Sequence, residues 1–574
     1  MLRSRAVISA ALLSLMAGAA QANAAPSSST KDDSSRKAGE GNQGISETFR
    51  SQKLTWEPCF PKPEPGMPPG AERLECAVMK APLDWKKQKG DTVDLAVSRL
   101  RPEKGEPENL LMTNPGGPGE AGLVVPMLFL DPKHAEVADS SEIVGMDVRG
   151  TGRSTNVTCG GTSIGHTRDV RDRGRANVGA MLDDAEGMAK ACQGASKPLG
   201  DFVNTAQTVR DFDLLRAVLG HKKTNWFGFS AGTWLGAQYA TAFPSRTDRF
   251  VFDSSVEFTS TWQKIYALQP MGFERRFRQD FLPWAARYAG VYGLGGSAED
   301  VRASYERIRA RLAEEPLDMG DSVLTATGLD SMIAGSLYNK GSFPRLGELL
   351  AGLNAAVGGP SARKERTEDG TAALRKRVEA VRQGAGAPGA AGLAGAPTGS
   401  PAGAPDAVDA TFYTIGCNDT RWHGNRRTLA ATSAAQGKLF PLIGWRSIAE
   451  PCIFWDRPAV KLPKPNGRGV PPVLMVQSEH DPATPMEGAR RANSRFADSR
   501  LLRVTGEGDH MLYGGGNDCV DRAVDSYLAK GELPARGATC EGGPLPEPSA
   551  GAGGEQHSAL RLSAFSKALP GDGR

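Results

Sequence analysis

The sequence predicts an α/β protein, in which a mostly parallel sheet flanked by helices is interrupted by a mainly helical insertion. Short β-rich segments alternate with helical ones up to Asp253, and this alternation is typical of a parallel sheet with helices on both faces. The alternation then stops, and helical patterns follow to about residue 380. The sheet pattern resumes at Val473, so one sheet domain is expected to enclose the insertion.

The first residues predict export. Two arginines in residues 1–5 precede the uncharged apolar run Ala6–Ala20, and Ala22-Asn23-Ala24 has the small-x-small pattern of a signal-peptidase site. We expect a signal peptide at 1–24 and a secreted, extracellular mature protein, with attachment to the cell wall left open. The apolar run is shorter than the ~20 residues of a spanning helix, so no membrane span is expected after cleavage.

The composition excludes several classes of protein. The chain has 69 Lys and Arg against 65 Asp and Glu, and a net charge of +4 gives no basis for a nucleic-acid partner. An apolar content of 39% argues against disorder throughout, while 69 glycines and 39 prolines among 574 residues indicate loop-rich segments beside a globular body. These numbers leave the oligomeric state open.

Residues 25–46 are polar and predict a linker or propeptide before the core. In the first part of the core, 47–258, apolar runs predict strands and helical periodicity predicts helices. The expected strands are Val93–Leu100, Leu110–Thr113, Glu142–Asp147, Asn225–Phe229 and Arg249–Asp253, and the expected helices are Ala206–Leu219 and Ala231–Phe243.

The insertion, 259–440, predicts a helical cap, and its segment 384–405 is Gly, Ala and Pro with too little apolar surface to order. The second part of the core, 441–540, completes the sheet, and 541–574 predict a flexible tail. The expected cap helices are Gly272–Tyr288, Ala298–Glu314 and Leu346–Ala356; the second part of the core predicts strands Val473–Gln477 and Leu501–Val504 and helices Met486–Phe496 and Asp518–Leu528.

Eight cysteines fit an oxidising compartment. Their pairing does not follow from the sequence, but they fall into four close couples, which makes neighbour pairing the working hypothesis. A metal site is disfavoured, because no C-x-x-C motif and no histidine cluster beside a cysteine occurs. The four couples are Cys59 and Cys76, Cys159 and Cys192, Cys417 and Cys452, and Cys519 and Cys540.

Ser230 is the expected nucleophile, in the G-x-S-x-G motif at 228–232. The motif alone is weak, and the chain contains a second match around Ser163. Context separates the two matches. Ser230 lies between an apolar strand and a helix, where a sharp turn exposes a nucleophile above a sheet, whereas Ser163 lies between polar and charged segments.

The base and the acid follow from the chain order Ser, Asp or Glu, His of this sheet architecture. Elimination among seven histidines leaves His510, in the loop after Leu501–Val504. Asp481 follows the strand Val473–Gln477 and is the expected acid, which would orient the imidazole and stabilise the imidazolium. Glu479 and Asp509 remain the rival acids.

An oxyanion hole is also required, since positioned N–H donors stabilise the developing negative charge. The segment Asn114-Pro115-Gly116-Gly117-Pro118-Gly119 follows an expected strand, and its glycines allow close backbone approach to a substrate. We expect donors from Gly116 and Gly117, with the N–H of Ala231 as the further donor.

The chain resembles the α/β-hydrolases of the proline iminopeptidase and tripeptidyl aminopeptidase type, especially secreted actinobacterial tripeptidyl aminopeptidases. The resemblance runs from about Leu54 to Cys540, outside the Gly/Ala/Pro segment. Two departures concern the pocket: Ala-Gly follows the serine where the group often has Tyr-Gly, and Asp precedes the histidine where the group often has Gly-His-Gly. The motifs that carry the resemblance are NPGGPG at 114–119, MDVRGTGRS at 146–154, GFSAGT at 228–233, DPATP at 481–485 and GDH at 508–510, with WEPC at 56–59 and IGCND at 415–419.

The resemblance implies a serine exopeptidase that releases short peptides, commonly tripeptides, from peptide substrates with free N-termini. Such selectivity needs an acidic group or carbonyl oxygens in the helical cap to hold the substrate ammonium, and Glu257 and Asp419 are candidates by position. A secreted carboxylesterase using the same triad is the alternative, because the fold does not choose the substrate. A binding protein without catalysis would lack a triad member, and none is missing. No metal or organic cofactor is expected.

Overall fold

The computed structural model describes residues 44–62, 66–162, 168–319, 323–357, 368–384 and 403–548. The chain divides into two units at Gly44 and Ile45, and the structure reported below is that of the second unit. The predicted signal peptide, nearly all of the predicted linker, Ser163 and most of the segment 384–405 lie outside the described residues.

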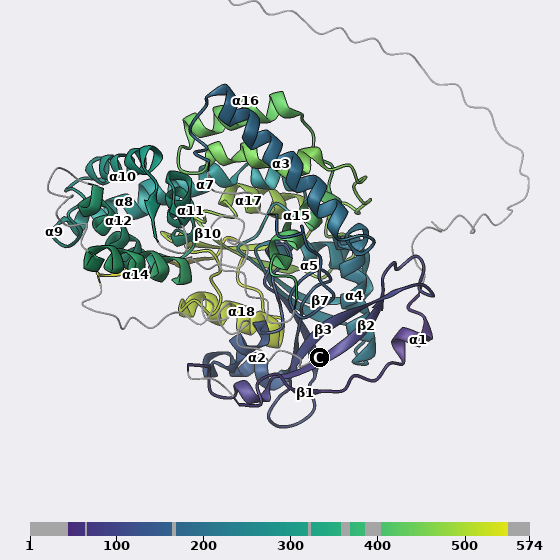
Figure 1. Cartoon of the computed structure of the whole chain (residues 1–574). Coiled ribbons are helices and arrows are strands. Elements are labelled where there is room, and N and C mark those ends of the chain that lie inside the picture. Colours follow the sequence, from purple (N-terminus) through teal and green to yellow (C-terminus); the bar gives the residue numbers. More distant parts are fainter. Residues whose placement is uncertain are drawn as a thin grey trace, which may run out of the picture. The chain divides into compact units, whose positions relative to one another are not determined.

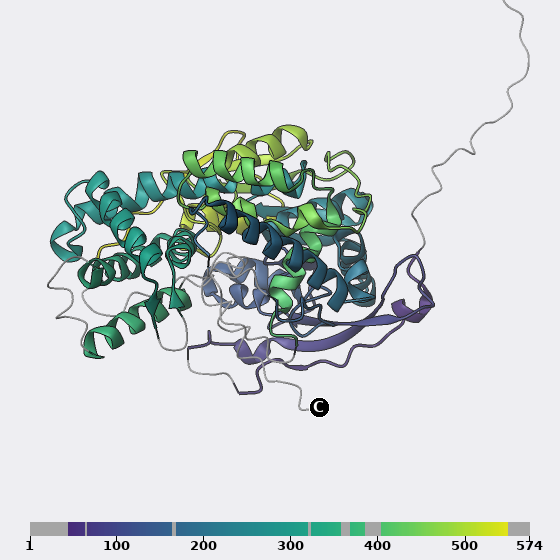
Figure 2. The ribbon, with the colours of Figure 1, turned by 45° about the horizontal axis from the view of Figure 1, so that its top comes forward.

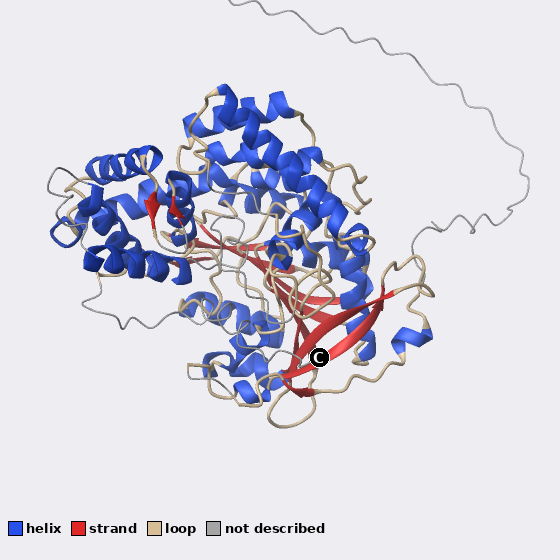
Figure 3. Ribbon diagram, in the orientation of Figure 1, coloured by secondary structure: helices blue, strands red, loops and turns tan. Residues whose placement is uncertain are grey.

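A single large sheet forms the core, in the order β1-β2-β3-β5-β4-β6-β7-β10-β11-β12 (Figure 3). The strands from β5 and β4 through to β12 pair in parallel, and β1, β2 and β3 extend the sheet with antiparallel pairing. The strands are β1 (Glu57–Pro58), β2 (Glu75–Pro82), β3 (Thr92–Leu100), β4 (Asn109–Asn114), β5 (Ser141–Met146), β6 (Thr224–Phe229), β7 (Thr247–Asp253), β10 (Val473–Ser478), β11 (Arg500–Thr505) and β12 (Thr539–Glu541).

Helices cover both faces of this sheet because successive strand residues point to opposite sides. Trp226 and Phe250 pack toward α4, α5 and α17, whereas their chain neighbours Phe227 and Val251 pack toward α2 and α18. Burial on both faces explains the continuous apolar runs of the central strands. These helices are α2 (Ala135–Ser140), α4 (Thr205–Val218), α5 (Ala231–Ala242), α17 (Met486–Arg495) and α18 (Asp518–Lys530), and the short α1 (Glu47–Arg50) precedes the sheet.

The insertion after β7 forms a helical cap with its own apolar core (Figures 1 and 2). A π-helical turn, Phe277–Phe281, joins α7 to α8, so the predicted helix Gly272–Tyr288 is nearly continuous. The cap elements are α6 (Trp262–Tyr266), α7 (Gln269–Arg276), α8 (Leu282–Arg287), α9 (Ala289–Tyr292), α10 (Ala298–Glu314), the hairpin β8 (Leu317–Asp318) and β9 (Val323–Leu324), α11 (Ala326–Ser336), α12 (Phe343–Val357), α14 (Glu368–Gly384), α15 (Ala407–Asp419) and α16 (Arg426–Leu439).

The division between core and cap differs from the sequence prediction in three places. Helix α3 (Arg175–Ala195), from the first part of the chain, packs its Leu182 against Leu429 and Ile448, beside α16 (Figure 1). The 3₁₀ segments η8 (Gly444–Ala449) and η9 (Pro451–Phe454), beyond residue 440, also pack with these helices. The first residues of the predicted tail are ordered, because the Trp284 indole donates to the Pro546 carbonyl at 2.6 Å.

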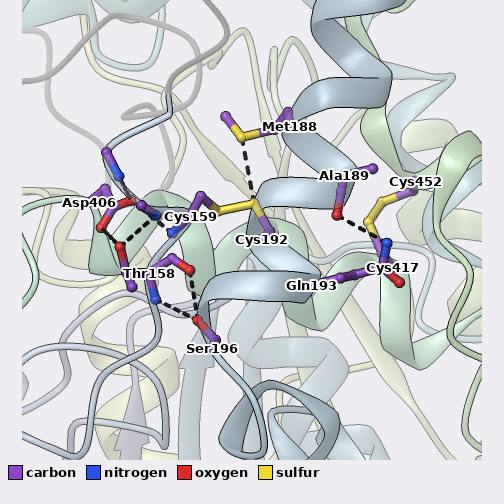
Figure 4. Close-up of a disulfide and its surroundings, with 12 residues drawn as sticks. Thr158, Cys159, Met188, Ala189, Cys192, Gln193, Ser196, Asp406, Cys417 and Cys452 are labelled. Atoms are coloured by element: carbon purple, nitrogen blue, oxygen red, sulfur yellow. Dashed lines mark hydrogen bonds between the residues drawn. A yellow bond between two sulfur atoms is a disulfide. The ribbon is translucent and has the colours of Figure 1, made fainter.

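Four disulfides join the eight cysteines in the predicted neighbour pairing. Cys519–Cys540 ties α18 to β12, and Cys59–Cys76 ties β2 to the segment beside β1. Figure 4 shows the other two, Cys159–Cys192 and Cys417–Cys452, close together at α3. Beside them Asp406 accepts hydrogen bonds from the Thr158 hydroxyl at 2.6 Å and from the Cys159 amide at 2.8 Å, which anchors the start of α15 (Figure 4). No described helix is long and apolar enough to cross a membrane.

Candidate active site

Ser230 lies at the turn from β6 into α5 with a φ of 57°, a left-handed conformation that is rare for a residue with a side chain. The turn is tight: a Cβ placed on Gly232 would lie 2.5 Å from the Asn114 carbonyl oxygen. Glycine is therefore required at that position. The Ser230 side chain sits at the carboxyl edge of the sheet, at the start of a helix, and the residue is 8% exposed.

His510 and Asp481 meet at the same edge, each on the loop that follows its strand. The Nδ1 atom of His510 lies 3.1 Å from Oδ1 and 3.0 Å from Oδ2 of Asp481. Both residues are buried, and the other ring nitrogen, Nε2, has no hydrogen-bond partner in the described structure. This leaves Nε2 for a serine proton, and catalytic contacts of this kind often tighten only when substrate binds.

Neighbouring donors saturate the Asp481 carboxylate. Its oxygens accept from the backbone amides of Ala483 and Thr484 at 2.9 and 2.8 Å, from the Thr484 hydroxyl at 2.8 Å and from the Gln477 side-chain amide at 3.2 Å. These contacts fix the acid before substrate arrives. They also fix its orientation toward the histidine.

The two rival acids have other partners. Glu479 accepts from the Gly506 amide at 3.1 Å, and Asp509 accepts from the Arg276 guanidinium at 2.5 Å and the Lys340 amide at 2.7 Å. The structure therefore gives His510 one carboxylate partner in the described chain, Asp481.

The predicted oxyanion loop lies against the turn from β6 into α5 at Ser230, called the elbow below, but its two glycines differ. The Gly116 N–H donates to the Asn114 side-chain oxygen at 3.0 Å, so it already has a partner in the described structure, whereas the sequence analysis expects it to bind the oxyanion. A Cβ on Gly116 would lie 2.8 Å from the Ala231 nitrogen and 3.0 Å from the Ser230 Cβ. Gly116 thus supplies space, and Gly117 and Ala231 remain the candidate donors.

The cap covers this loop through α15. A Cβ on Gly119 would lie 2.5 Å from the Thr411 methyl group, and Ile415 lines a small pocket with Gly116 and Ala231. On the other side of the site, the Tyr338 ring lies 5.3 Å from the His510 ring, edge to face. The reacting groups are therefore enclosed between the sheet edge and the cap.

The two acidic residues proposed from the sequence for the substrate ammonium have other partners. Glu257 is paired with Arg491 and Arg495, each at 2.8 Å. Asp419 is 2% exposed, and its oxygens accept from the Thr205 amide and hydroxyl at 2.7 and 2.6 Å and from the Trp262 indole at 3.2 Å. Burial raises the pKa of Asp419 to about 6. Neither carboxylate is free to receive a ligand.

Sequence reasoning missed a third acidic residue, Glu450, which lies between η8 and η9 and is partly exposed. Its Oε1 accepts from the Cys452 amide at 3.2 Å, and among the described residues its second oxygen has no partner and its carboxylate no paired cation. Burial raises the pKa of Glu450 to about 7. Burial, and then the charge of Glu450, also raises the pKa of the Tyr266 and Tyr413 hydroxyls.

We call Tyr266, Tyr338, Tyr413 and Glu450 the cap wall, because, besides burial, the charge of Glu450 raises the pKa of Tyr266 and of Tyr413, and Tyr338 also raises that of Tyr266. Tyr266 is within electrostatic reach of both Glu450 and Tyr338, and Tyr338 packs on His510. Cys417–Cys452 ties the Glu450 segment to α15, the helix that covers the oxyanion loop. The described residues contain no group of three His, Cys, Asp or Glu side chains suited to a metal ion.

The sheet topology and the order of Ser230, Asp481 and His510 along it define an α/β-hydrolase of the serine hydrolase class. A family model described as alpha/beta hydrolase fold matches residues 109–291, and one described as TAP-like protein matches 441–540. The tripeptidyl aminopeptidase of Streptomyces lividans is 30% identical over 86% of this chain and 88% of its own. The chain therefore belongs to the tripeptidyl aminopeptidase family.

Other relatives are more distant. The serine protease Hip1 of Mycobacterium tuberculosis is 24% identical over 87% of this chain and 93% of its own. Carboxylesterase B of the same species is 25% identical over 81% of this chain and 86% of its own. Together with the fold, these similarities identify a serine hydrolase and peptidase.

Proposed function

We propose that this protein is a secreted serine exopeptidase that releases short peptides, chiefly tripeptides, from free N-termini through an acyl-enzyme. The names of the relatives in Streptomyces support the peptide length, and the four disulfides and the signal-peptide pattern support export. The cover of α15 over the oxyanion loop favours entry of a chain end over that of a continuous polypeptide.

The reaction follows from the three side chains. His510 Nε2 takes the proton of Ser230 as the serine oxygen attacks the scissile carbonyl, and Asp481 stabilises the imidazolium. The N–H groups of Gly117 and Ala231 stabilise the oxyanion. The imidazolium then protonates the leaving amine, and water, activated by the same histidine, releases the peptide and restores Ser230.

The observation that carries the preference for a free N-terminus is the unpaired carboxylate of Glu450. A partly buried charge without a counter-ion is unfavourable, and an incoming ammonium supplies the missing partner. Among the described residues the Asp419 carboxylate has no paired cation either, but its oxygens are bonded and it is closed to solvent. Glu450 differs, because it is partly exposed and one of its oxygens has no partner among the described residues.

The test compares a tripeptidyl anilide, its N-acylated twin and a short-chain ester, each with the wild-type protein, Ser230→Ala and Glu450→Gln. We expect cleavage of the free-amine peptide, loss of all activity in Ser230→Ala, and a KM raised about 10- to 100-fold in Glu450→Gln for the free-amine peptide only. Glu479→Gln, another partly exposed glutamate, is the matched control and should leave KM unchanged.

A carboxylesterase is the second candidate, favoured by the similarity to carboxylesterase B. Turnover of the ester alone would reject the peptidase proposal and leave the triad in place. Equal cleavage of the free and acylated peptides would instead reject the role of Glu450.

A further inference from the structure

Three of the non-glycine residues with a left-handed backbone in the described structure lie on segments that contact or adjoin a single residue, Asp253. Non-glycine residues with positive φ are Ser230 at 57°, Ser254 at 50°, Asp498 at 56° and Met511 at 70°. Asp498 is of a type that tolerates this region, whereas serine and methionine adopt it at a cost that the surroundings must offset. Ser230, Ser254 and Met511 belong to three separate segments, and Asp253 touches or adjoins all three.

Asp253, the last residue of β7, connects the nucleophile to the segment after the base. Its main-chain oxygen accepts from the Ser230 amide at 3.0 Å. Its side-chain Oδ2 accepts from the amides of Leu512 and Tyr513 at 2.9 and 2.8 Å, just beyond His510. One residue therefore holds the elbow with its backbone and the histidine loop with its carboxylate.

Ser254 completes the connection. Its hydroxyl donates to Asp253 Oδ1 at 3.0 Å and accepts from the Met511 amide at 2.7 Å. Its own amide donates to the carbonyl of Val476 in β10 at 2.9 Å, on the strand that leads to the acid. Asp253 and Ser254 thus bond to all three segments that carry the triad.

The Asp253 carboxylate accepts from neutral groups and has no salt bridge to a Lys or Arg in the described chain. Asp253 is completely buried, and burial raises its pKa to about 6. A charge held in this way is poor evidence for a gain in stability. Its bonds to the Leu512 and Tyr513 amides place it beside the His510 loop, and the charge of His510 favours the ionised form of Asp253, lowering its pKa. This placement suggests a role in the reaction.

We propose that Asp253 and Ser254 are positioning residues that hold the Ser230 elbow and the His510 loop at a fixed separation, and that the Asp253 carboxylate adds a second negative charge near the His510 imidazolium. Asp481, from the loop after β10, bonds to the His510 ring, and Tyr338, from the segment after α11, packs against it. Asp253 accepts from the amides of Leu512 and Tyr513, two and three residues beyond His510. Replacing the Asp253 carboxylate is therefore expected to change both the separation of Ser230 from the His510 loop and the negative charge near the imidazolium.

The experiment compares Asp253→Asn with Asp147→Asn in the full-length mature protein. Asp147 is a matched control, because it is equally buried and accepts from the amides of Gly122, Leu123 and Arg153 at 2.7, 3.1 and 2.8 Å without contact to Ser230 or His510. The readouts are kcat and KM, the rate at which a fluorophosphonate labels Ser230, and the pH profile of that labelling.

For Asp253→Asn we expect kcat and the labelling rate to fall about 10- to 100-fold, with KM within about threefold. The acid limb of the labelling profile should also move to lower pH, since loss of a negative charge disfavours the imidazolium. Asp147→Asn should lose comparable stability while its acid limb stays in place. An unmoved acid limb in Asp253→Asn, with a rate equal to that of Asp147→Asn, would overturn the proposal.

Ser254→Ala keeps the test decisive if Asp253→Asn does not fold. This change removes only the hydroxyl between Asp253 and the Met511 amide, so the labelling rate should fall about tenfold with an unshifted acid limb. A wild-type labelling rate in Ser254→Ala would contradict the positioning role.

Discussion

Carboxylates at the sheet edge and on the cap wall of this enzyme differ in their exposure to solvent and in how fully their oxygens are hydrogen-bonded. At the sheet edge, Asp481 and Asp253 are closed to solvent and their oxygens are occupied by donors from the protein. On the cap wall, Glu450 keeps solvent access, and one of its two oxygens has no partner in the described structure. The carboxylates at the sheet edge therefore have all their hydrogen bonds before substrate binds, whereas Glu450 has an oxygen left for a donor on the substrate.

This contrast has a chemical reason. Transition-state stabilisation gains from dipoles and charges that need no rearrangement, so the groups around His510 are fixed in advance. A recognition group gains from the reverse arrangement, because an unsatisfied charge discriminates strongly between a ligand that pairs with it and one that does not. We therefore expect substitutions at the sheet edge to act on kcat and substitutions on the wall to act on KM.

The largest effect is expected for Asp481→Asn. The asparagine keeps the shape of the side chain but offers an N–H where the imidazole needs an acceptor, so kcat should fall about 10⁴-fold. KM should change little, because the residue does not reach the substrate. Steady-state kinetics with the free-amine tripeptide and with an ester measure both constants. An equal loss in kcat for Glu450→Gln would contradict the expectation that sheet-edge substitutions act on kcat and cap-wall substitutions act on KM.

A smaller effect is expected in the pH dependence of recognition. The raised pKa of Glu450, about 7, means that its carboxylate ionises as pH rises through that value. The substrate α-amino group loses its proton above about 7.7 to 8.0. The ratio of kcat/KM for the free peptide to that for its N-acylated twin should therefore peak between these values, and the contribution of His510 cancels in the ratio.

The same profile measured with Glu450→Gln is the control. Its ratio should be lower, should lose the rise through about pH 7, and should fall less above about pH 8, because the carboxylate that favours the ammonium is gone. A wild-type ratio that does not change between pH 6 and pH 8 would exclude Glu450 as the ammonium partner.

The parts of the molecule that follow local rules could be predicted from the sequence. The central strands, the elbow at Ser230 and the order of the three triad residues depend on apolar runs and turn chemistry that neighbouring residues determine. Helix α3 was missed although its buried Met181, Ala185, Met188 and Cys192 recur with helical spacing, a signal that the surrounding polar residues obscured.

The remaining features depend on contacts between distant segments. The bond from the Gly116 N–H to Asn114 is a local turn, but nothing near Gly116 in the sequence reveals its close approach to the Ala231 nitrogen. Glu257 and Asp419 were plausible by position, and partners from α17 and α4 occupy them. Glu450 lies in a short irregular segment without periodicity, and only its electrostatic effect on the buried Tyr266 and Tyr413 makes it distinctive.

The smallest expected effect is in stability, and its sign distinguishes the two regions. The Glu450 pKa is raised from 4.5 in the unfolded chain to about 7, so the folded protein holds the proton more tightly. The stability of the folded state must then decrease as pH rises from about 4.5 to about 7. Glu450→Gln removes this penalty, and without substrate it should melt about 1–3 °C above the wild type at pH 8 and equal to it near pH 4.5.

Asp481→Asn should show the opposite sign at pH 8, because the asparagine presents an N–H to the donors that the carboxylate now satisfies. Differential scanning calorimetry of both variants across pH measures the two signs in one experiment. A decrease in melting temperature for Glu450→Gln at pH 8 would mean that a protein group already satisfies this carboxylate. The ammonium of the substrate would then have to bind elsewhere on the wall.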